Sequence, residues 1–116
     1  MAIRVYEYSK CSTCRKALKF LEARGIAHTA VPIVDSPPSV AELKTMLGHV
    51  GLKRLFNTSG VQYRELGISE KLKTMSEAEA LALLSKNGKL IKRPFLLLKD
   101  RGLVGFQEAE WKAAFK

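Results

Sequence analysis

The order of hydrophobic patterns in the first third of the chain constrains its fold more than any other feature. Residues 3–8 are rich in the β-branched and aromatic types that suit a strand. A helix with Gly25 as its stop signal should follow, because apolar residues recur at helical spacing, namely Cys14, Ala17, Leu18 and Leu21. Residues 26–33 alternate as a second strand, in which Pro32 favours an edge position. This order predicts a βαβ unit with parallel strands.

The only two cysteines stand where the first strand meets this helix. Cys11 is placed at or just before the first helical turn, where free N–H groups and the helix dipole favour a thiolate. The dipole alone lowers a thiol pKa by less than about one unit, so nearby cations must contribute. Lys10 and Arg15 are adjacent in sequence, and Arg93 is a candidate from far along the chain. Cys14 lies one turn further on, close enough to form a disulfide with Cys11.

This Cys-x-x-Cys pair predicts redox chemistry, and three other interpretations stay open. The pair could belong to a zinc site, although the remaining soft ligands, His28 and His49, are singly placed. It could be a structural disulfide, although the loop it would close is short and no signal peptide is evident. It could be two inert buried thiols, although a helix start flanked by Lys and Arg does not favour this. A redox pair without a signal peptide is expected in the cytosol, where thiols stay reduced.

The large positive net charge of the chain does not by itself identify a class of binding partner. The formal net charge of +9 raises encounter rates with any anion, including nucleic acids. Lys and Arg are spread in ones and twos without a basic tract, so we expect no direct DNA or RNA binding. No apolar run approaches the roughly 20 residues of a membrane helix, so we expect no membrane contact either.

The middle of the chain, about residues 36–90, predicts a helical insertion. Two capping boxes mark helix starts, Ser39 with Glu42 and Ser76 with Glu79. The first helix should end near Gly48 and the second at residues 87–88. A short helix over residues 52–56, the loop 57–60 and an irregular segment anchored by Tyr63, Leu66 and Ile68 should lie between them.

The last quarter returns to the sheet. Residues 95–98 are apolar without alternation, as in a strand buried on both faces, and a turn at 99–102 and a strand at 103–106 complete a hairpin. A last helix over residues 108–115 should place Trp111 inward. We therefore predict one α/β domain over residues 1–116, with a mixed four-stranded sheet and a helical insertion between strands two and three. This order resembles the thioredoxin-like fold, with a core from residues 1–35 and 91–116.

Five ordered motifs resemble those of the ArsC/Spx family along essentially the whole chain. They are Cys11-Ser12-Thr13-Cys14-Arg15-Lys16, Leu55-Phe56-Asn57-Thr58-Ser59-Gly60, Tyr63-Arg64-Glu65-Leu66-Gly67, Ile91-Lys92-Arg93-Pro94 and Val104-Gly105-Phe106. The resemblance implies that Cys11 is the reactive cysteine and that Arg93 binds an oxyanion beside it, ahead of a cis-proline, Pro94. An arginine fork suits this task. Further substrate contacts are expected from Lys10, Ser12, Thr13, Arg15 and Asn57.

Two positions depart from one branch of the family. The glutaredoxin-coupled arsenate reductases carry two further arginines around their oxyanion site, and the matching positions here hold Asn57 and Phe106. Charge-assisted contacts contribute roughly 1.5–3 kcal/mol each, so their loss should weaken binding of a divalent oxyanion severely. The sequence is therefore more similar to the branch that contains Spx, MgsR and YffB.

Three functional hypotheses follow. The leading one is a cytosolic thiol-disulfide reductase acting on glutathione-linked or protein disulfides, in which Cys11 attacks and Cys14 resolves the mixed disulfide. It would act as a monomer with no bound cofactor or metal, and with glutathione as a thiol co-substrate. The second is a redox-sensing regulator of the Spx kind that binds an RNA polymerase subunit. The third is an arsenate reductase that depends on glutathione and glutaredoxin.

Overall fold

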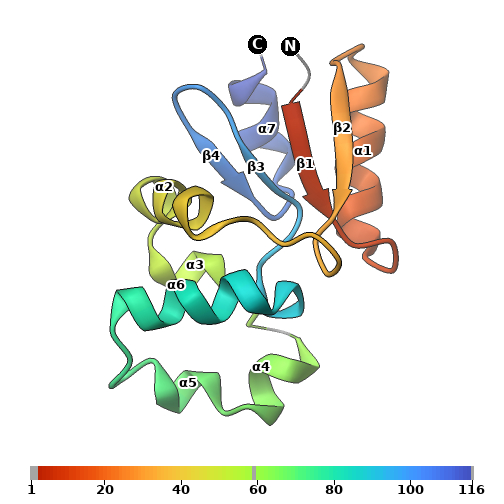
Figure 1. Cartoon of the computed structure of the whole chain (residues 1–116). Coiled ribbons are helices and arrows are strands. Elements are labelled where there is room, and N and C mark those ends of the chain that lie inside the picture. Colours follow the sequence, from red (N-terminus) through yellow and green to blue (C-terminus); the bar gives the residue numbers. More distant parts are fainter. Residues whose placement is uncertain (1–2, 59, 116) are drawn as a thin grey trace.

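A computed structural model describes residues 3–58 and 60–115; Ser59 of the expected loop and residues 1–2 and 116 of the expected domain lie outside the described residues. Four strands form one sheet in the order β2-β1-β3-β4 (Figure 1). β1 (Ile3–Glu7) is parallel to β2 (His28–Pro32) and antiparallel to β3 (Phe95–Leu97), which pairs with antiparallel β4 (Gly102–Val104). The predicted mixed four-stranded sheet of an α/β protein is confirmed, with β2 at an edge.

Two helices cover one face of the sheet, α1 (Ser12–Ala23) and α7 (Glu108–Ala114) (Figure 1). The side chains buried there include Val5, Ala17, Leu21, Leu96, Leu103 and Trp111. The Trp111 Nε1 donates to the Gly105 carbonyl oxygen at 3.1 Å, so the indole is buried without an unpaired polar atom. α1 ends as predicted at Gly25, whose φ of 66° permits the left-handed turn of a Schellman motif.

The segment between β2 and β3 is helical, as predicted. Its elements are α2 (Val40–Val50), α3 (Leu52–Leu55), α4 (Val61–Glu65), α5 (Ile68–Lys71), α6 (Glu77–Lys86) and the 3-10 helix η1 (Gly88–Leu90). Both capping boxes, at Ser39 and Ser76, are confirmed. Helix α2 continues past Gly48 and ends at Gly51, because only Gly51 of the two adopts a positive φ, 85°. The segment expected to be irregular forms α4 and α5, which are too short to show a helical stripe in sequence.

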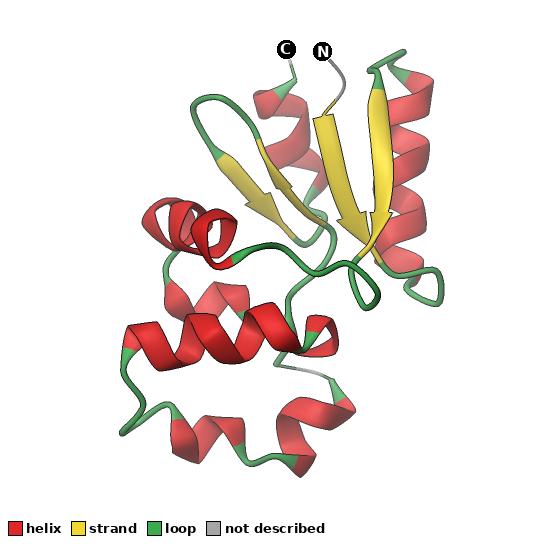
Figure 2. Cartoon of the chain, in the orientation of Figure 1, coloured by secondary structure: helices red, strands yellow, loops and turns green. Residues whose placement is uncertain are grey.

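The second face of the sheet packs against this insertion (Figures 1 and 2). Tyr6 and Phe95 meet edge to face at 5.6 Å, and the same cluster contains Leu43 and Met46 of α2. The Tyr6 hydroxyl donates to Glu42 at 3.0 Å. Burial, followed by this carboxylate, raises the pKa of Tyr6 to about 12. The insertion is thereby fixed across the end of the sheet at which β1 leads into α1.

Candidate active site

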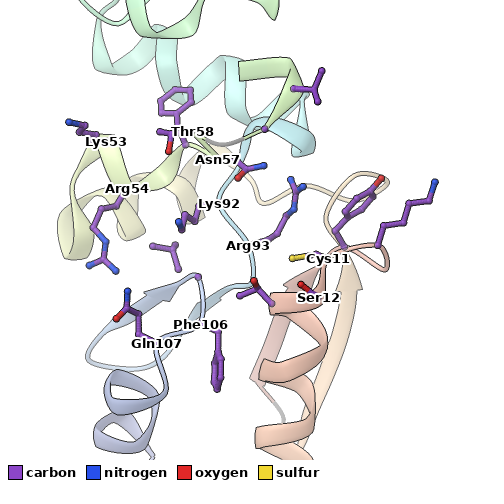
Figure 3. A pocket seen from close by; sticks show the side chains of 18 residues that line it. Cys11, Ser12, Lys53, Arg54, Asn57, Thr58, Lys92, Arg93, Phe106 and Gln107 are labelled. Carbon is purple, nitrogen blue, oxygen red and sulfur yellow. The ribbon is translucent and has the colours of Figure 1, made fainter. Parts of the chain in front are cut away.

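A cavity of about 860 Å³ opens between the start of α1, the segment before β3, and α3 with the loop that follows it (Figure 3). Its described lining contains five cationic side chains and no carboxylate. The cations are Lys10, Lys53, Arg54, Lys92 and Arg93. The other lining residues are Tyr8, Cys11, Ser12, Thr13, Phe56, Asn57, Thr58, Gly60, Val61, Val104, Gly105, Phe106 and Gln107. The composition suits an anionic ligand.

Cys11 is the N-cap residue of α1, which confirms its predicted place at the helix start. Its backbone is extended, and its Sγ accepts a hydrogen bond from the Cys14 backbone N–H at 3.4 Å. The Cys11 N–H in turn donates to the Tyr8 carbonyl oxygen at 3.0 Å, which closes the turn after β1. Figure 3 shows the sulfur directed into the cavity beside Arg93. The thiol therefore takes the place that a Ser or Asp oxygen occupies in other helix caps.

The Cys11 site favours the thiolate. Burial on its own would raise the pKa of Cys11, but several groups act in the other direction. They are hydrogen bonds from the side chain and backbone of Cys14, the positive charge of Arg93, and the backbone N–H of Thr13. The net effect is a pKa of Cys11 below its ordinary value of 9.0. A lowered thiol pKa increases the fraction of Cys11 present as the nucleophilic thiolate at any pH below 9.0.

Cys14 has the opposite environment. It is fully buried on α1 and does not line the cavity. Burial raises the pKa of Cys14 to about 12, with help from the hydrogen bond and charge of Cys11 and against a backbone hydrogen bond from Tyr8. Both cysteines are free thiols in this structure. The two sulfurs of one motif thus differ in both exposure and acidity.

Arg93 is fixed beside Cys11 by two contacts. Its guanidinium lies over the Tyr8 ring, 4.8 Å from the ring centroid, and its Nη1 donates to the Lys89 carbonyl oxygen at 3.1 Å. The peptide bond between Arg93 and Pro94 is cis, as the family resemblance implied. Arg93 comes from the segment before β3, so the fold brings together groups more than 80 residues apart in sequence.

The other expected contact residues divide into two groups. Lys10, Ser12, Thr13 and Asn57 line the cavity. Pro94 is buried and does not line the cavity. Arg15 lies outside the lining, because its guanidinium turns back along the surface and donates to the Ser9 carbonyl oxygen at 3.1 and 3.3 Å. Arg15 is therefore not among the residues that line the cavity, and its expected contact with a substrate stays a prediction.

Sequence reasoning missed three cations of the cavity, namely Lys53, Arg54 and Lys92. Lys92 is tied to α3 because its N–H donates to the Leu55 carbonyl oxygen at 2.8 Å. An isolated bridge between Phe56 and Ile91 strengthens the same junction. Lys53 and Arg54 directly precede one family motif and Lys92 lies within another, which was the only signal available in sequence.

Within residues 3–58 and 60–115, no three His, Cys, Asp or Glu side chains are grouped as metal ligands. None of the described helices is long and apolar enough to cross a membrane.

The fold and this cavity define a class: a thioredoxin-like α/β protein with an acidic thiol at the start of its first helix. Comparison with known proteins gives the family. The ArsC family model matches residues 6–114, and the chain belongs to the ArsC family. The uncharacterized protein YusI of Bacillus subtilis (strain 168) is 46% identical over 114 residues, 97% of each chain. The match confirms the family predicted from the motifs.

Other relatives differ in what they are named for. An arsenate reductase of Neisseria meningitidis serogroup A is 30% identical over 106 residues, 89% of each chain. The global transcriptional regulator Spx of Streptococcus agalactiae serotype V is 29% identical over 113 residues, 96% of this chain and 81% of its own. A crystal structure from Bacteroides fragilis, described as ArsC family related, has a TM-score of 0.90 at 47% identity and covers 97% of each chain. The fold is thus shared across relatives with different named functions.

Proposed function

We propose that this protein is a thiol-disulfide oxidoreductase. The Cys11 thiolate attacks one sulfur of a substrate disulfide, forms a mixed disulfide with it and releases the other half as a thiolate. Cys14 then loses its proton and attacks the Cys11 sulfur, which releases the second thiol and leaves a Cys11–Cys14 disulfide. An external thiol, such as glutathione in the cytosol, returns both cysteines to the dithiol form and is itself oxidised.

The contrast between the two thiols supports this proposal most directly. Cys11 is accessible and its pKa is lowered, whereas Cys14 is buried and its pKa is raised to about 12. Two thiols buried alike in the core would not differ in this way, because burial raises the pKa of each. The Cys14 N–H donates to the Cys11 Sγ at 3.4 Å, and Cys14 is the buried residue one helical turn after Cys11, a spacing that suits resolution of a mixed disulfide.

The test measures the acidity of Cys11 and turnover together. Iodoacetamide alkylation of the reduced protein should follow a single ionisation below 9.0, with the modified peptide identified as the one containing Cys11. The protein should also reduce a glutathione mixed disulfide when an external thiol is supplied. An unperturbed thiol pKa together with no turnover would refute the proposal.

Arsenate reduction is a second candidate, because relatives with 30% identity bear that name. The cavity argues against strong arsenate binding: Asn57 and Phe106 line it at the two positions where the resemblance to glutaredoxin-coupled reductases implies arginines. Arg93 would then be the remaining arginine of that set. A coupled assay with arsenate, glutathione and glutaredoxin decides, and we expect activity far below that with disulfides.

A redox-sensing regulator is a third candidate, supported by the Spx relative. In that case, the Cys11–Cys14 disulfide would alter the affinity for an RNA polymerase subunit. A pull-down with purified RNA polymerase under oxidising and reducing conditions tests this, and redox-dependent binding would favour it over the reductase.

A further inference from the structure

Most of the positive charge in the cavity is not needed to activate the thiol. Arg93 supplies the positive charge that lowers the pKa of Cys11. Lys53, Arg54 and Lys92 lie on the other side of the cavity from Cys11 (Figure 3). We call these three residues the cationic wall. Its charges must be explained by something other than the Cys11 thiolate.

The two lysines of the cationic wall have no acidic partner in the described part of the chain. Arg54 has one, since its guanidinium lies 3.7 Å from the Glu110 carboxylate, but both side chains are more than a third exposed. Such an exposed pair is weak. The wall therefore offers at least two uncompensated ammonium groups to a ligand.

The backbone makes room for one of these lysines. A Cβ built on Gly105 would lie only 2.9 Å from the Cε of Lys92, so the Lys92 stem crosses the cavity surface directly over the Gly105 backbone. Gly105 has a φ of 72°, a conformation that other residues rarely adopt. The absence of a side chain at residue 105 thus allows Lys92 to lie along the cavity rather than away from it.

We propose that the cationic wall binds a carboxylate of the substrate and selects disulfides whose thiol halves carry one near the sulfur. This inference rests on the proposed oxidoreductase function and names its substrate class: acidic low-molecular-weight disulfides and mixed disulfides with acidic thiols. Lys53 and Lys92 are its specificity-determining residues. The covalent step is unchanged: the Cys11 thiolate displaces one thiolate from the disulfide, and an external thiol later reduces the cysteine pair.

The expected preference is the reverse of that in free solution. A free thiolate repels a disulfide that carries carboxylates, because both are anions. In the cavity, the cationic wall would attract that carboxylate while Cys11 attacks the neighbouring sulfur. The preference should weaken as salt is added, because Lys53 is exposed, Lys92 is only partly buried, and the Debye length falls from about 30 Å at 0.01 M to 3 Å at 1 M salt.

The experiment compares two disulfides of similar size, dianionic 3,3′-dithiodipropionate and neutral bis(2-hydroxyethyl) disulfide. Rate constants for reaction with reduced wild-type protein are each divided by the rate constant of dithiothreitol with the same disulfide, which corrects for intrinsic reactivity. The ratio of anionic to neutral values should exceed one. Each of Lys53→Gln and Lys92→Gln should lower this ratio about two- to fivefold, and the double variant should lower it further.

Lys99→Gln is the matched control, since Lys99 is an exposed lysine in the turn between β3 and β4, at the far end of the sheet (Figure 1). It removes the same net charge and should leave the ratio unchanged. The pH dependence of Cys11 alkylation in each variant shows whether the thiolate itself has been altered. A wild-type ratio of one or less, or a ratio insensitive to Lys53→Gln and Lys92→Gln, would overturn the inference while the reductase stands. Failure to react with either disulfide would instead overturn the proposed function.

Discussion

The two sides of the cavity are built in different ways. On the side of Cys11, the reactive sulfur caps a helix and is held by backbone hydrogen bonds within one turn, with buried Cys14 behind it. On the cationic wall, the charges of Lys53, Arg54 and Lys92 stand at the ends of long side chains, and among the described residues only Arg54 has an acidic partner, Glu110. In the functions proposed here, reactivity would depend on hydrogen bonds within one helical turn, whereas selectivity would depend on lysine charges at the cavity surface that salt can screen.

The largest effect is expected when the Cys11 sulfur at the start of α1 is removed. Cys11→Ser should reduce disulfide reduction at least about a thousandfold, because a serine hydroxyl cannot replace the thiolate that attacks the disulfide and forms the mixed disulfide. The fold should persist, since a serine is a good N-cap and would keep the hydrogen bond to the Cys14 N–H. Turnover of a glutathione mixed disulfide and thermal unfolding check both parts. Substantial residual activity would place the chemistry elsewhere.

A second change separates the two tasks assigned to Cys14. Cys14→Ser keeps a hydrogen-bond donor at residue 14 but cannot resolve the mixed disulfide between Cys11 and the substrate. Each chain should therefore accumulate one mixed disulfide, which intact-protein mass spectrometry would detect. Cys14→Ala also removes the donor. Because that donor lowers the pKa of Cys11, the alanine variant should react roughly tenfold more slowly at pH 7 than the serine variant. Equal rates in the two variants would show that the side chain of Cys14 does not stabilise the thiolate.

The same contrast explains what the sequence could and could not predict. The helix start at Cys11 and the capping boxes at Ser39 and Ser76 follow from local patterns, and the structure confirms them. The strand predicted over residues 95–98 is present as Phe95–Leu97, with Phe95 and Leu96 buried. The cationic wall could not be predicted, because Lys53 and Lys92 meet only through tertiary contacts between α3 and the segment before β3. Arg15 shows that the side-chain direction could not be predicted either: its guanidinium donates to the Ser9 carbonyl oxygen and lies outside the cavity lining, and its role in substrate binding stays a prediction.

A third change tests the positive charge of Arg93, which comes from the segment before β3 and lies beside Cys11. Arg93→Met should raise the pKa of Cys11, because the positive charge of Arg93 helps to lower it. The alkylation rate should then fall about two- to fivefold at pH 7 and recover at higher pH, where both proteins are fully ionised. Because the pKa of Cys11 is lower in the folded than in the unfolded chain, ionisation of Cys11 stabilises the fold. This stabilisation is complete above the pKa of the thiol in the unfolded chain and is lost as the pH falls through its pKa in the folded chain. The free energy of unfolding of Arg93→Met should therefore rise less between neutral and alkaline pH than that of the wild type.

Arg93→Lys provides the control for this third change, since it keeps the charge and loses the planar fork. Its alkylation profile should lie between those of the wild type and Arg93→Met. A profile in Arg93→Met identical to the wild type would show that the backbone and Cys14 alone acidify Cys11, which would sharpen the contrast between the two sides of the cavity.

The smallest effect is expected from Tyr8, which contacts the guanidinium rather than the sulfur. The Tyr8 ring lies 4.8 Å from Arg93, and an exposed cation–π contact contributes about 0.5–1 kcal/mol. Tyr8→Leu should let Arg93 move and slow alkylation of Cys11 at pH 7 by at most about twofold, whereas Tyr8→Phe keeps the ring and should match the wild type. In the Arg93→Met background, Tyr8→Leu should have no further effect on the pH profile. An additional shift there would show that Tyr8 acts on Cys11 directly, through the turn whose carbonyl accepts the Cys11 N–H, and not by positioning Arg93.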